Sequence, residues 1–380
     1  MLHQIDAVPA LALGENALQS LPETAEKRAE GAPILLICDA GLAETPLVSG
    51  LTEAFSTRKT ALETHVPAAR EPSAASISAA AEAARGLKAG LIIGLGGGSA
   101  LDIAKMTAVC AHPQGASDPM SYALGTRILD VSLPKILAPT TAGTGAEAAS
   151  TCVFSAPDGR KTWAWGPAAK PSLAILDPVA TATLPPHLTA WCALDAFVHA
   201  FEAATNRNAH AGVHPHAHAA LRLVAAHLPK TLKNNEIEDR QALLLAAFHA
   251  GVAIDACSTA LAHNLSHALA GLAPVHHGLA TALAFEATLP WLVETPTPAL
   301  RAAAAALDLP GPEALSRFLG RLMDQAGIER RLPKDFRSFA PEALRDEALR
   351  PEHAPMLAAT ARAASPEDLL AFSRTLLALA

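Results

Sequence analysis

The sequence predicts an α/β amino-terminal domain built on a parallel sheet, followed by an all-α carboxy-terminal domain. The chain has 380 residues, enough for two domains at roughly 150 residues each. Its first half alternates short apolar runs with longer amphipathic stretches, a pattern typical of parallel strands alternating with helices. From Pro185 onward, long Ala- and Leu-rich segments replace the short runs. We place the boundary at Leu184-Pro185-Pro186, which gives domains 1–184 and 185–380.

The first half contains four predicted strands with helices between them. Each apolar run ends at aspartate, glycine or proline, residues that favour turns. The predicted strands are 32–38, 90–95, 135–138 and 173–176. Residues 73–88 and 99–111 have helical spacing and are the predicted helices.

The second half is predicted to be helical to its end. Apolar residues recur at helical spacing over 188–205, 216–228, 240–255, 258–272 and 279–293. Near the carboxyl terminus, Ser365-Pro366-Glu367-Asp368 offers a capping serine, a first-turn proline and two first-turn acids. We therefore expect a last helix to begin there.

Composition excludes several classes of protein. Apolar residues make up 51% of the chain, too many for a disordered protein. A net charge of −7 argues against a nucleic-acid surface, and no apolar run reaches the ~20 residues of a membrane span. The amino terminus lacks the basic start and apolar block of a secretory signal. The five scattered cysteines indicate buried free thiols in a reducing compartment, so we expect a cytoplasmic enzyme.

A glycine-rich turn, Gly94-Leu95-Gly96-Gly97-Gly98-Ser99, follows a predicted strand and opens a predicted helix. Without Cβ atoms, a phosphate can approach the backbone and meet the free N–H groups of the helix start. Ser99 stands where the full dinucleotide fingerprint has a third glycine, and the Gly-Lys-Ser/Thr of a phosphate loop is missing. The alternative is a tight turn without a ligand. The context favours anion binding.

Two further turns follow predicted strands. Asp39 ends one strand, where an acid can accept hydrogen bonds from a ribose diol and would repel a 2′-phosphate. Thr140-Thr141-Ala142-Gly143-Thr144-Gly145 ends another. Ligands of open α/β sheets bind at the carboxyl ends of strands, so these turns and the glycine-rich turn are expected to converge. The alternatives, a turn-forming aspartate and a helix-capping loop, remain open.

Several of the 16 histidines lie in apolar helices. Asp195 and His199 share one face of LDAFVHAFEA, and His263 and His267 share a face of LAHNLSHALAGL. With His277, Asp195, His199 and His263 would supply three nitrogens and one oxygen, a set suited to Fe²⁺ or Zn²⁺. The alternative is a hydrogen-bonded Asp–His pair and core histidines. The run from His210 to His218 contains glycine and proline and is interpreted as a solvated connector between two helices.

Five motifs together resemble the iron-containing (group III) alcohol dehydrogenases, the family that includes maleylacetate reductases. They are GLGGGSALDIAK, PTTAGTGAEA, the Asp177-Pro178 strand end, LDAFVHAFEA, and HNLSHALAG with HHGLATA. They occur in the family's order over about residues 1–293. The resemblance implies a dehydroquinate synthase-like architecture, with a dinucleotide-binding domain, a helical domain and the active site in the cleft.

The resemblance also implies the roles of individual residues. The metal ligands fall on Asp195, His199, His263 and His277, and the catalytic His267 lies near nicotinamide and substrate without binding metal. The cofactor positions fall on Asp39, Gly97, Gly98, Ser99, Thr140, Thr141 and Lys161, with a backbone contact at Ala180.

The chain also departs from the family pattern. The departures are Ala146 in place of a common serine, Cys192-Ala193-Leu194 before the aspartate, His276 in place of a proline, and His210 in place of Asn-Pro. They indicate a divergent member in which His276 could compete with His277 as a ligand.

The sequence therefore predicts an alcohol dehydrogenase that uses NAD rather than NADP and one divalent metal, Fe²⁺ or Zn²⁺. The metal would act as a Lewis acid on a small alcohol or aldehyde. We expect no nucleic-acid or membrane partner, and a homodimer if the chain associates. The alternatives are a maleylacetate reductase, a glycerol-type dehydrogenase, and a non-catalytic metal- or nucleotide-binding module. Maleylacetate carries two carboxylates, whereas Arg222, Lys230 and Lys233 lie far in sequence from the proposed ligands.

Overall fold

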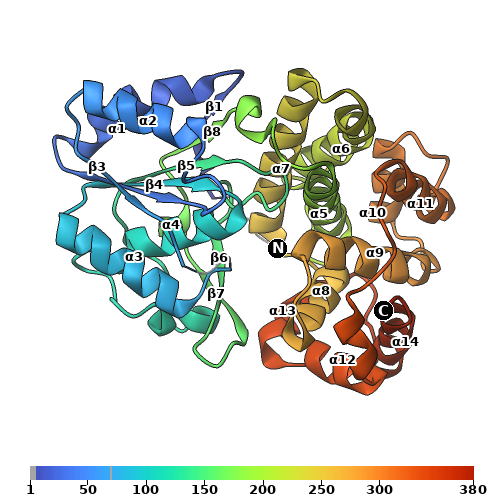
Figure 1. The fold of residues 1–380 in the computed structure, drawn as a ribbon. Coiled ribbons are helices and arrows are strands. Elements are labelled where there is room, and N and C mark those ends of the chain that lie inside the picture. The colour runs from blue at the N-terminus through green and yellow to red at the C-terminus, as the bar shows by residue number, and fades with distance from the viewer. Residues whose placement is uncertain (1–5, 69–70) are drawn as a thin grey trace. The chain divides into compact units, whose positions relative to one another are not determined.

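The computed structural model of the chain describes residues 6–68 and 71–380 and confirms the predicted fold class (Figure 1). Its described residues form two compact units. The sheet unit comprises 6–141 and 146–183, and the helical unit comprises 142–145 and 184–380.

The sheet unit contains a six-stranded parallel sheet with the order β1-β8-β5-β4-β2-β3. The four inner strands are buried along their whole length, which explains their continuous apolar sequences. They are β2 (Ile34–Cys38), β4 (Leu91–Gly96), β5 (Lys135–Pro139) and β8 (Leu173–Leu176). The sequence predicted these strands. It did not predict the short, partly exposed edge strands β1 (Ala10–Leu13) and β3 (Leu62–His65).

The order of the strands reverses between β2 and β4. The chain moves outward from β2 to β3, then crosses back to place β4 on the other side of β2 and continues outward through β5 to β8. Such a reversal leaves a crevice outside the carboxyl ends of the two strands, where open α/β sheets bind their ligands. The end of β2 and the start of the glycine-rich turn meet at this point.

Helices cover both faces of the sheet (Figure 1). On one face, α3 (Ala74–Leu87) and α4 (Gly98–Cys110) pack against Leu35, Ile37 and Ile92. On the other, α1 (Leu21–Ala29), α2 (Pro46–Thr57) and the short turn η1 (Ala17–Ser20) pack against alternate residues of the same strands. An antiparallel hairpin of β6 (Thr151–Ser155) and β7 (Lys161–Trp165) follows β5, and the sequence analysis did not predict it.

Short 3-10 helical segments connect the remaining parts of the sheet unit. They are η2 (Pro119–Gly125), η3 (Pro167–Ala169) and η4 (Pro178–Thr181). The carboxylate of Asp177 precedes η4 and accepts three backbone N–H groups, from Asn16 at 3.1 Å, Leu18 at 3.0 Å and Val179 at 3.0 Å. This aspartate therefore ties the end of β8 to the turn after β1.

The helical unit is built around α5 (Pro186–Thr205), which packs against α6, α7 and α9. The predicted helices of this half are present, with ends shifted by at most three residues, except that α6 extends six residues beyond its predicted end. They are α6 (His214–Asn234), α7 (Ile237–Cys257), α8 (Leu261–Leu272) and α9 (His277–Val293). The remaining elements are α10 (Pro298–Ala306), η5 (Pro312–Ala314), α11 (Leu315–Gln325), η6 (Lys334–Ser338), α12 (Pro341–Ala348), η7 (Pro351–His353), α13 (Ala354–Ala359) and α14 (Pro366–Leu377).

Helix ends follow their local chemistry. The last helix begins where predicted, because Ser365 and Asp368 form a reciprocal capping box. Helix α8 begins at Leu261 rather than at the predicted residue 258, since Ser258 has a left-handed φ of 72° and cannot continue a helix.

The interpretation of the His210–His218 run as a connector is wrong for residues 214–218. These residues form the first turns of α6, and Pro215 is tolerated there because first-turn N–H groups need no partner inside the helix. His216 lies with its Nδ1 atom 3.0 Å from Nδ1 of His249 on α7. Of the four histidines in this described run, only His210 precedes α6.

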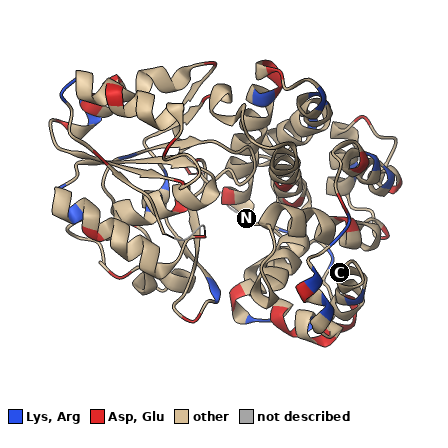
Figure 2. Ribbon diagram, in the orientation of Figure 1, with Lys and Arg blue, Asp and Glu red and all other residues tan. Residues whose placement is uncertain are grey.

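In the described residues none of the five cysteines forms a disulfide; four of them are buried and Cys192 is partly exposed. Acidic and basic residues are interspersed on the outer helices (Figure 2), as in the 2.6 Å ion pair between Arg58 and Glu26. In the described parts of the chain, no helix is by itself long and apolar enough to cross a membrane; α7 and α8, bent by 97°, pass that test only as a pair.

Candidate functional site

The turns at the carboxyl ends of β2, β4 and β5 lie side by side. The register pairs Cys38 with Leu95 and Gly96 with Pro139, so the residues that follow these strands are neighbours. The N–H group of Thr140 donates to the carbonyl of Gly96 at 2.9 Å. The convergence expected for Asp39, the glycine-rich turn and Thr140 is therefore present in the sheet unit.

Asp39 contacts the glycine-rich turn directly. Its Oδ2 atom accepts the N–H group of Gly97 at 2.6 Å. Gly96 has a φ of 152°, and a Cβ atom there would lie 2.4 Å from the same Asp39 oxygen. Only glycine fits at this position. Burial raises the pKa of Asp39, and the hydrogen bond from Gly97 opposes that rise.

The start of α4 is open to an anion. Gly97 is the N-cap, and no side chain of the described residues caps this helix. The N–H groups of its first turn, which includes Gly98 and Ser99, consequently have no partner within the helix and face the space beyond its end. The side chain of Thr141 lies near Gly97, 3.6 Å from where a Cβ atom would be. This is the geometry of a phosphate-binding turn.

Two other predicted cofactor residues lie at the edges of this region. Lys161 begins β7 and forms an ion pair with Glu71. Burial raises the pKa of Asp102 on α4, and the positive charge of Lys161 is one of several nearby groups that oppose this rise. Ala180 lies in η4, where its N–H group donates to the carbonyl of Asp177 at 3.1 Å.

The rest of the threonine-rich segment belongs to the helical unit. Gly143 packs against Cys192 of α5, and Gly145 packs against Gly251 of α7 so closely that a Cβ atom would lie 2.5 Å from a backbone oxygen. Close helix packing thus explains these two glycines.

A cavity of about 580 Å³ in the sheet unit lies elsewhere. It is lined by Ser132, Lys135, Lys170 and Ser172 at the amino ends of β5 and β8. The glycine-rich turn lies at the carboxyl ends, so this cavity is distinct from the candidate cofactor site.

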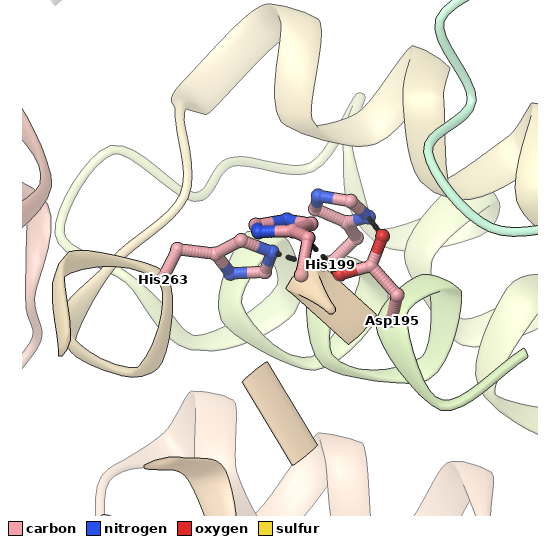
Figure 3. Close-up of side chains that lie close together, drawn as sticks. Asp195, His199 and His263 are labelled. Carbon is pink, nitrogen blue, oxygen red and sulfur yellow. Dashed lines mark ion pairs between the residues drawn. The ribbon is translucent and has the colours of Figure 1, made fainter. Parts of the chain in front are cut away.

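In the helical unit, four predicted ligands from three helices converge (Figure 3). Asp195 and His199 lie one turn apart on α5, His263 lies on α8, and His277 is the first residue of α9. One ligand atom from each lies within 4.8 Å of the others. Oδ1 of Asp195 lies 3.5 Å from Nε2 of His263 and 3.4 Å from Nε2 of His277.

Three of these side chains present buried polar atoms that lack a partner. Within the described residues, Oδ1 of Asp195, Nδ1 of His199 and Nε2 of His263 have no hydrogen-bond partner. Leaving such atoms buried and unsatisfied costs about 1–3 kcal/mol each. A divalent cation at the centre would satisfy all three. One carboxylate and three imidazoles fit Fe²⁺ or Zn²⁺ better than Mg²⁺ or Ca²⁺.

The electrostatics of the group also suit a cation. Burial alone would raise the pKa of Asp195, but the three neighbouring histidines hold it below its usual range. Burial lowers the pKa of His199, which favours the neutral imidazole that metals bind. Burial would also lower the pKa of His263, but Glu202 and Asp195 raise it. The carboxylates that favour a proton on His263 equally favour a metal ion.

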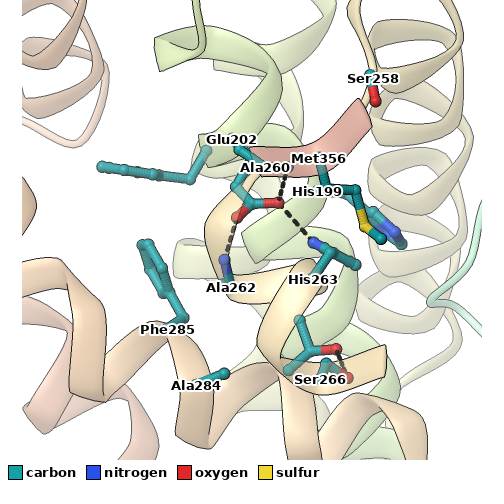
Figure 4. Close-up of polar contacts among 12 residues, drawn as sticks. His199, Glu202, Ser258, Ala260, Ala262, His263, Ser266, Ala284, Phe285 and Met356 are labelled. Carbon is teal, nitrogen blue, oxygen red and sulfur yellow. Dashed lines mark hydrogen bonds and ion pairs between the residues drawn. The ribbon is translucent and has the colours of Figure 1, made fainter. Parts of the chain in front are cut away.

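Further polar contacts hold the outer nitrogens of two histidines, and the contact of His263 with Glu202 is drawn in Figure 4. Glu202 of α5 accepts a hydrogen bond from Nδ1 of His263 at 2.6 Å. Ser266 lies 3.2 Å from Nδ1 of His277 and accepts a hydrogen bond from Thr281 at 2.9 Å. The sequence analysis missed these residues. A signal for Glu202 was present, since Asp195, His199 and Glu202 follow the i, i+4, i+7 spacing of one helix face.

His267 lies beside the group of four. It is one turn after His263 on α8, with its ring centroid 5.4 Å from that of His277 and 5.9 Å from that of the buried His353. His276, the residue weighed against His277, instead packs its ring 4.8 Å from Trp191. The structure brings His277, and not His276, into the group of four.

Comparison with known proteins assigns the chain to a family. The family model described as iron-containing alcohol dehydrogenase matches residues 9–178, and its carboxy-terminal counterpart matches residues 189–369. The chain belongs to the iron-containing alcohol dehydrogenase family. The family resemblance of the five motifs is therefore confirmed.

The chain is similar in sequence to proteins that are named alcohol dehydrogenases. Long-chain-alcohol dehydrogenase 1 of Geobacillus thermodenitrificans is 35% identical over 280 residues, covering 72% of this chain and 70% of the relative. Probable alcohol dehydrogenase EutG of Escherichia coli is 31% identical over 281 residues, covering 73% and 70%.

Solved structures share the fold of this alcohol dehydrogenase. The crystal structure of a 1,3-propanediol oxidoreductase superposes with a TM-score of 0.89 at 22% identity, over 98% of this chain and 99% of that one. Sulfoacetaldehyde reductase from Bifidobacterium kashiwanohense, solved with NAD⁺, gives 0.89 at 22% identity and covers 99% of both chains.

Membership makes this protein an alcohol dehydrogenase, an oxidoreductase that transfers a hydride between an alcohol or aldehyde and a nicotinamide cofactor. The predicted enzyme class is confirmed. The alternative of a non-catalytic binding module is wrong.

Proposed function

We propose that this dehydrogenase interconverts a small alcohol and its aldehyde with NAD(H) and one divalent metal, Fe²⁺ or Zn²⁺. Asp195, His199, His263 and His277 would hold the metal. The observation that carries this proposal is the convergence of their four ligand atoms, three of them buried without a partner in the described chain. Residues 1–184 would bind the dinucleotide, and residues 185–380 the metal and substrate.

NAD would bind at the strand reversal of the sheet unit. The open start of α4 supports a role for Gly97, Gly98 and Ser99 in holding the pyrophosphate, with Thr140 and Thr141 beside it. Asp39 would accept hydrogen bonds from the adenosine ribose and exclude a 2′-phosphate. Lys161 and the backbone of Ala180 complete the proposed cofactor contacts.

The chain's own residues would perform binding, orientation and proton transfer. When bound, the divalent ion supplies Lewis acidity, which lowers the pKa of the alcohol hydroxyl. His267 would accept the hydroxyl proton, directly or through a ribose hydroxyl, and pass it to solvent. Its place one turn from His263 supports this role without making it a ligand. Orientation of substrate and nicotinamide supplies much of the remaining rate.

The substrate class we propose is a small neutral alcohol. Curated relatives are named for long-chain alcohols, 1-propanol, sulfoacetaldehyde, choline and 4-hydroxybutyrate, so the family spans several substrates. The ion pairs of the candidate metal group in the described chain involve the carboxylates of Asp195 and Glu202 and no lysine or arginine. They therefore provide no cationic side chain for the two carboxylates of maleylacetate.

Metal analysis coupled to a substrate panel tests this proposal. Protein purified without oxygen should contain about one equivalent of iron or zinc per chain and form NADH from a simple primary alcohol. His263→Ala should lose the stoichiometric metal, whereas the control His214→Ala, outside the four-residue group, should keep it. Full metal content in His263→Ala, or turnover of maleylacetate alone, would contradict the assignment.

We also propose a cytoplasmic homodimer. The free thiols support a reducing compartment. Strand β1 ends the sheet, and its Leu11 and Leu13 are 38% and 39% exposed, so this edge offers a surface for a second copy. Light scattering should give twice the mass of the chain. A monomer at micromolar concentration would contradict this.

A further inference from the structure

Glu202 is a buried acid whose position calls for an explanation. It lies on α5, one turn after His199 and two turns after Asp195, so all three share a face of the helix. Its side chain is 6% exposed. Among the ion pairs of the described residues, its partner is His263 rather than a lysine or arginine. A carboxylate so far from water needs strong donors to remain charged.

Three donors surround this carboxylate (Figure 4). Oε2 accepts from Nδ1 of His263 at 2.6 Å and from the N–H group of Ala260 at 2.7 Å. Oε1 accepts from the N–H group of Ala262 at 2.7 Å. Ala260 and Ala262 lie at the start of α8, where the helix dipole and the unpaired N–H groups stabilise an anion. Glu202 is therefore held as a carboxylate in one orientation.

This geometry fixes the tautomer of His263. An ionised carboxylate can only accept, so the hydrogen of the neutral imidazole must reside on Nδ1. The lone pair is then on Nε2, the atom that lies 3.5 Å from Oδ1 of Asp195 and has no hydrogen-bond partner in the described chain. A carboxylate on the outer nitrogen of a metal-binding histidine both orients the ring and makes the ligand more basic.

We infer that Glu202 is a positioning residue for the metal centre. It locks His263 in the tautomer and ring orientation that present Nε2 to the ion. It also brings the count of buried carboxylates at the centre to two, with Asp195, which balances the two charges of a divalent cation. The inference rests on the metal site of the proposed function, and no motif or resemblance in the sequence assigned Glu202 this role.

The competing explanation is purely structural, because Glu202 also caps the start of α8. Asn206 provides a matched control. It directly follows the end of α5, four residues after Glu202, and its Nδ2 atom donates to the carbonyls of Cys257 at 3.1 Å and Ser258 at 2.8 Å. It therefore tethers the same connection between α7 and α8 but contacts none of the four proposed ligands.

The experiment measures metal affinity and stability separately. The unmodified protein, Glu202→Gln, Glu202→Asp and Asn206→Ala are stripped of metal and titrated with Zn²⁺ against a chromophoric chelator. Thermal unfolding of each metal-free protein reports the structural contribution. The visible spectrum of the Co²⁺ form reports the ligand geometry without any turnover assay.

We expect Glu202→Gln to bind Zn²⁺ about 10- to 100-fold more weakly and to alter the Co²⁺ spectrum. Glu202→Asp, which restores the charge, should recover part of the affinity. Asn206→Ala should lower the melting temperature while keeping affinity within about threefold.

Three results would overturn the inference. The first is a Glu202→Gln affinity within threefold of the unmodified protein. The second is an equal affinity loss in Glu202→Gln and Asn206→Ala for an equal loss of melting temperature. The third result applies if Glu202→Gln does not fold. It is a Zn²⁺ affinity and Co²⁺ spectrum of Glu202→Asp that equal those of the unmodified protein, because the shorter aspartate side chain cannot reach His263 in the same way. Failure of the unmodified protein to bind Zn²⁺ would instead reject the proposed metal site itself, and the inference with it.

Discussion

Asp39 should determine the preference for NAD over NADP. Asp39→Gly should reduce this preference, measured as the ratio of kcat/KM for the two cofactors. The carboxylate is anchored by Gly97, whose N–H group lies 2.6 Å from Oδ2, so it cannot easily turn away from a ligand at the end of β2. The glycine variant removes the charge, the acceptor and the side chain together. Asp39→Asn removes only the charge, because its amide oxygen can still accept from Gly97.

The expected size of the effect follows from Coulomb's law. A 2′-phosphate in place of a hydroxyl that donates to Asp39 would put two negative charges about 5 Å apart. At an effective dielectric constant of about 20, each pair of unit charges then costs about 3 kcal/mol. Allowing for solvent and small movements, we expect kcat/KM for NADP to rise about 10- to 200-fold in both variants. Loss of a charged hydrogen bond, about 1.5 kcal/mol or more, should lower kcat/KM for NAD at least tenfold in Asp39→Gly.

The pH dependence supplies an independent check. Burial raises the pKa of Asp39 from its ordinary value, against the opposing hydrogen bond from Gly97. Acidification therefore protonates this carboxyl group at a higher pH than it would an exposed aspartate. The preference of the unmodified enzyme for NAD should shrink as pH falls, and by more than that of Asp39→Asn, in which only the 2′-phosphate itself, with a pKa of about 6, still titrates.

The assay is initial-rate kinetics with each cofactor at fixed alcohol concentration, from pH 5 to pH 8. The quantity compared is the ratio of kcat/KM for NAD to kcat/KM for NADP. In this ratio, any effect of the substitution on alcohol binding cancels. Equal use of NAD and NADP by the unmodified enzyme would refute the reasoning. So would an unchanged ratio in both variants.

Other perturbations test separate parts of the molecule. His267→Gln should keep its metal, lose about 100-fold or more in turnover, and change one limb of the pH–rate profile; loss of metal would make His267 a ligand. Burial lowers the pKa of Lys135 to about 7 from its ordinary 10.5, so the unfolded chain binds more protons there between these values and stability rises with pH across that window. Lys135→Met removes the titrating group together with its hydrogen bonds to Ser132 and the carbonyl of Ala168, so urea unfolding should show that the rise of stability between pH 7 and pH 10.5 is flattened. Gly96→Ala would place a Cβ atom 2.4 Å from Asp39 and should cost about 1–3 kcal/mol with weaker NAD binding. The control Gly97→Ala, with its nearest contact at 3.6 Å, should change the melting temperature little, and equal effects of the two substitutions would contradict the geometry.

The sequence could predict the elements whose residues all lie in the same environment, either fully buried or on one clear face. Strands β2, β4, β5 and β8 are buried on both faces, so their sequences are continuous apolar runs. Strand β3, with the sequence LETH, has two exposed polar residues and gives no such signal. The hairpin of β6 and β7 alternates between faces over only five residues in each strand, too short to stand out from a loop.

The candidate site shows the same division. The pairs Asp195–His199 and His263–His267 are visible as one-turn spacings on apolar helices. Their meeting with His277 depends on how α5, α8 and α9 pack, which no local pattern encodes, and the motif resemblance supplied it. For the run around His214, a local pattern was visible but was interpreted wrongly as a connector between helices. Its proline suggested a break, but at the first turn of α6 a proline is compatible with a helix.

Because Asp195, His199 and Glu202 act from one face of α5, the number of residues between them cannot change without moving one of them off that face. Each residue turns a helix by about 100°, so inserting or deleting one residue between His199 and Glu202 would rotate that carboxylate to a different side of α5. The metal centre would lose its support even though every side chain were retained. Length changes in this segment should thus be far more damaging than most substitutions. The partly exposed turn at 207–212 lies beyond the end of α5 and does not set the spacing of these three residues. A single alanine inserted after Ala200 should weaken metal binding at least as much as Glu202→Gln does, and the same insertion after Ala211 should leave it unchanged.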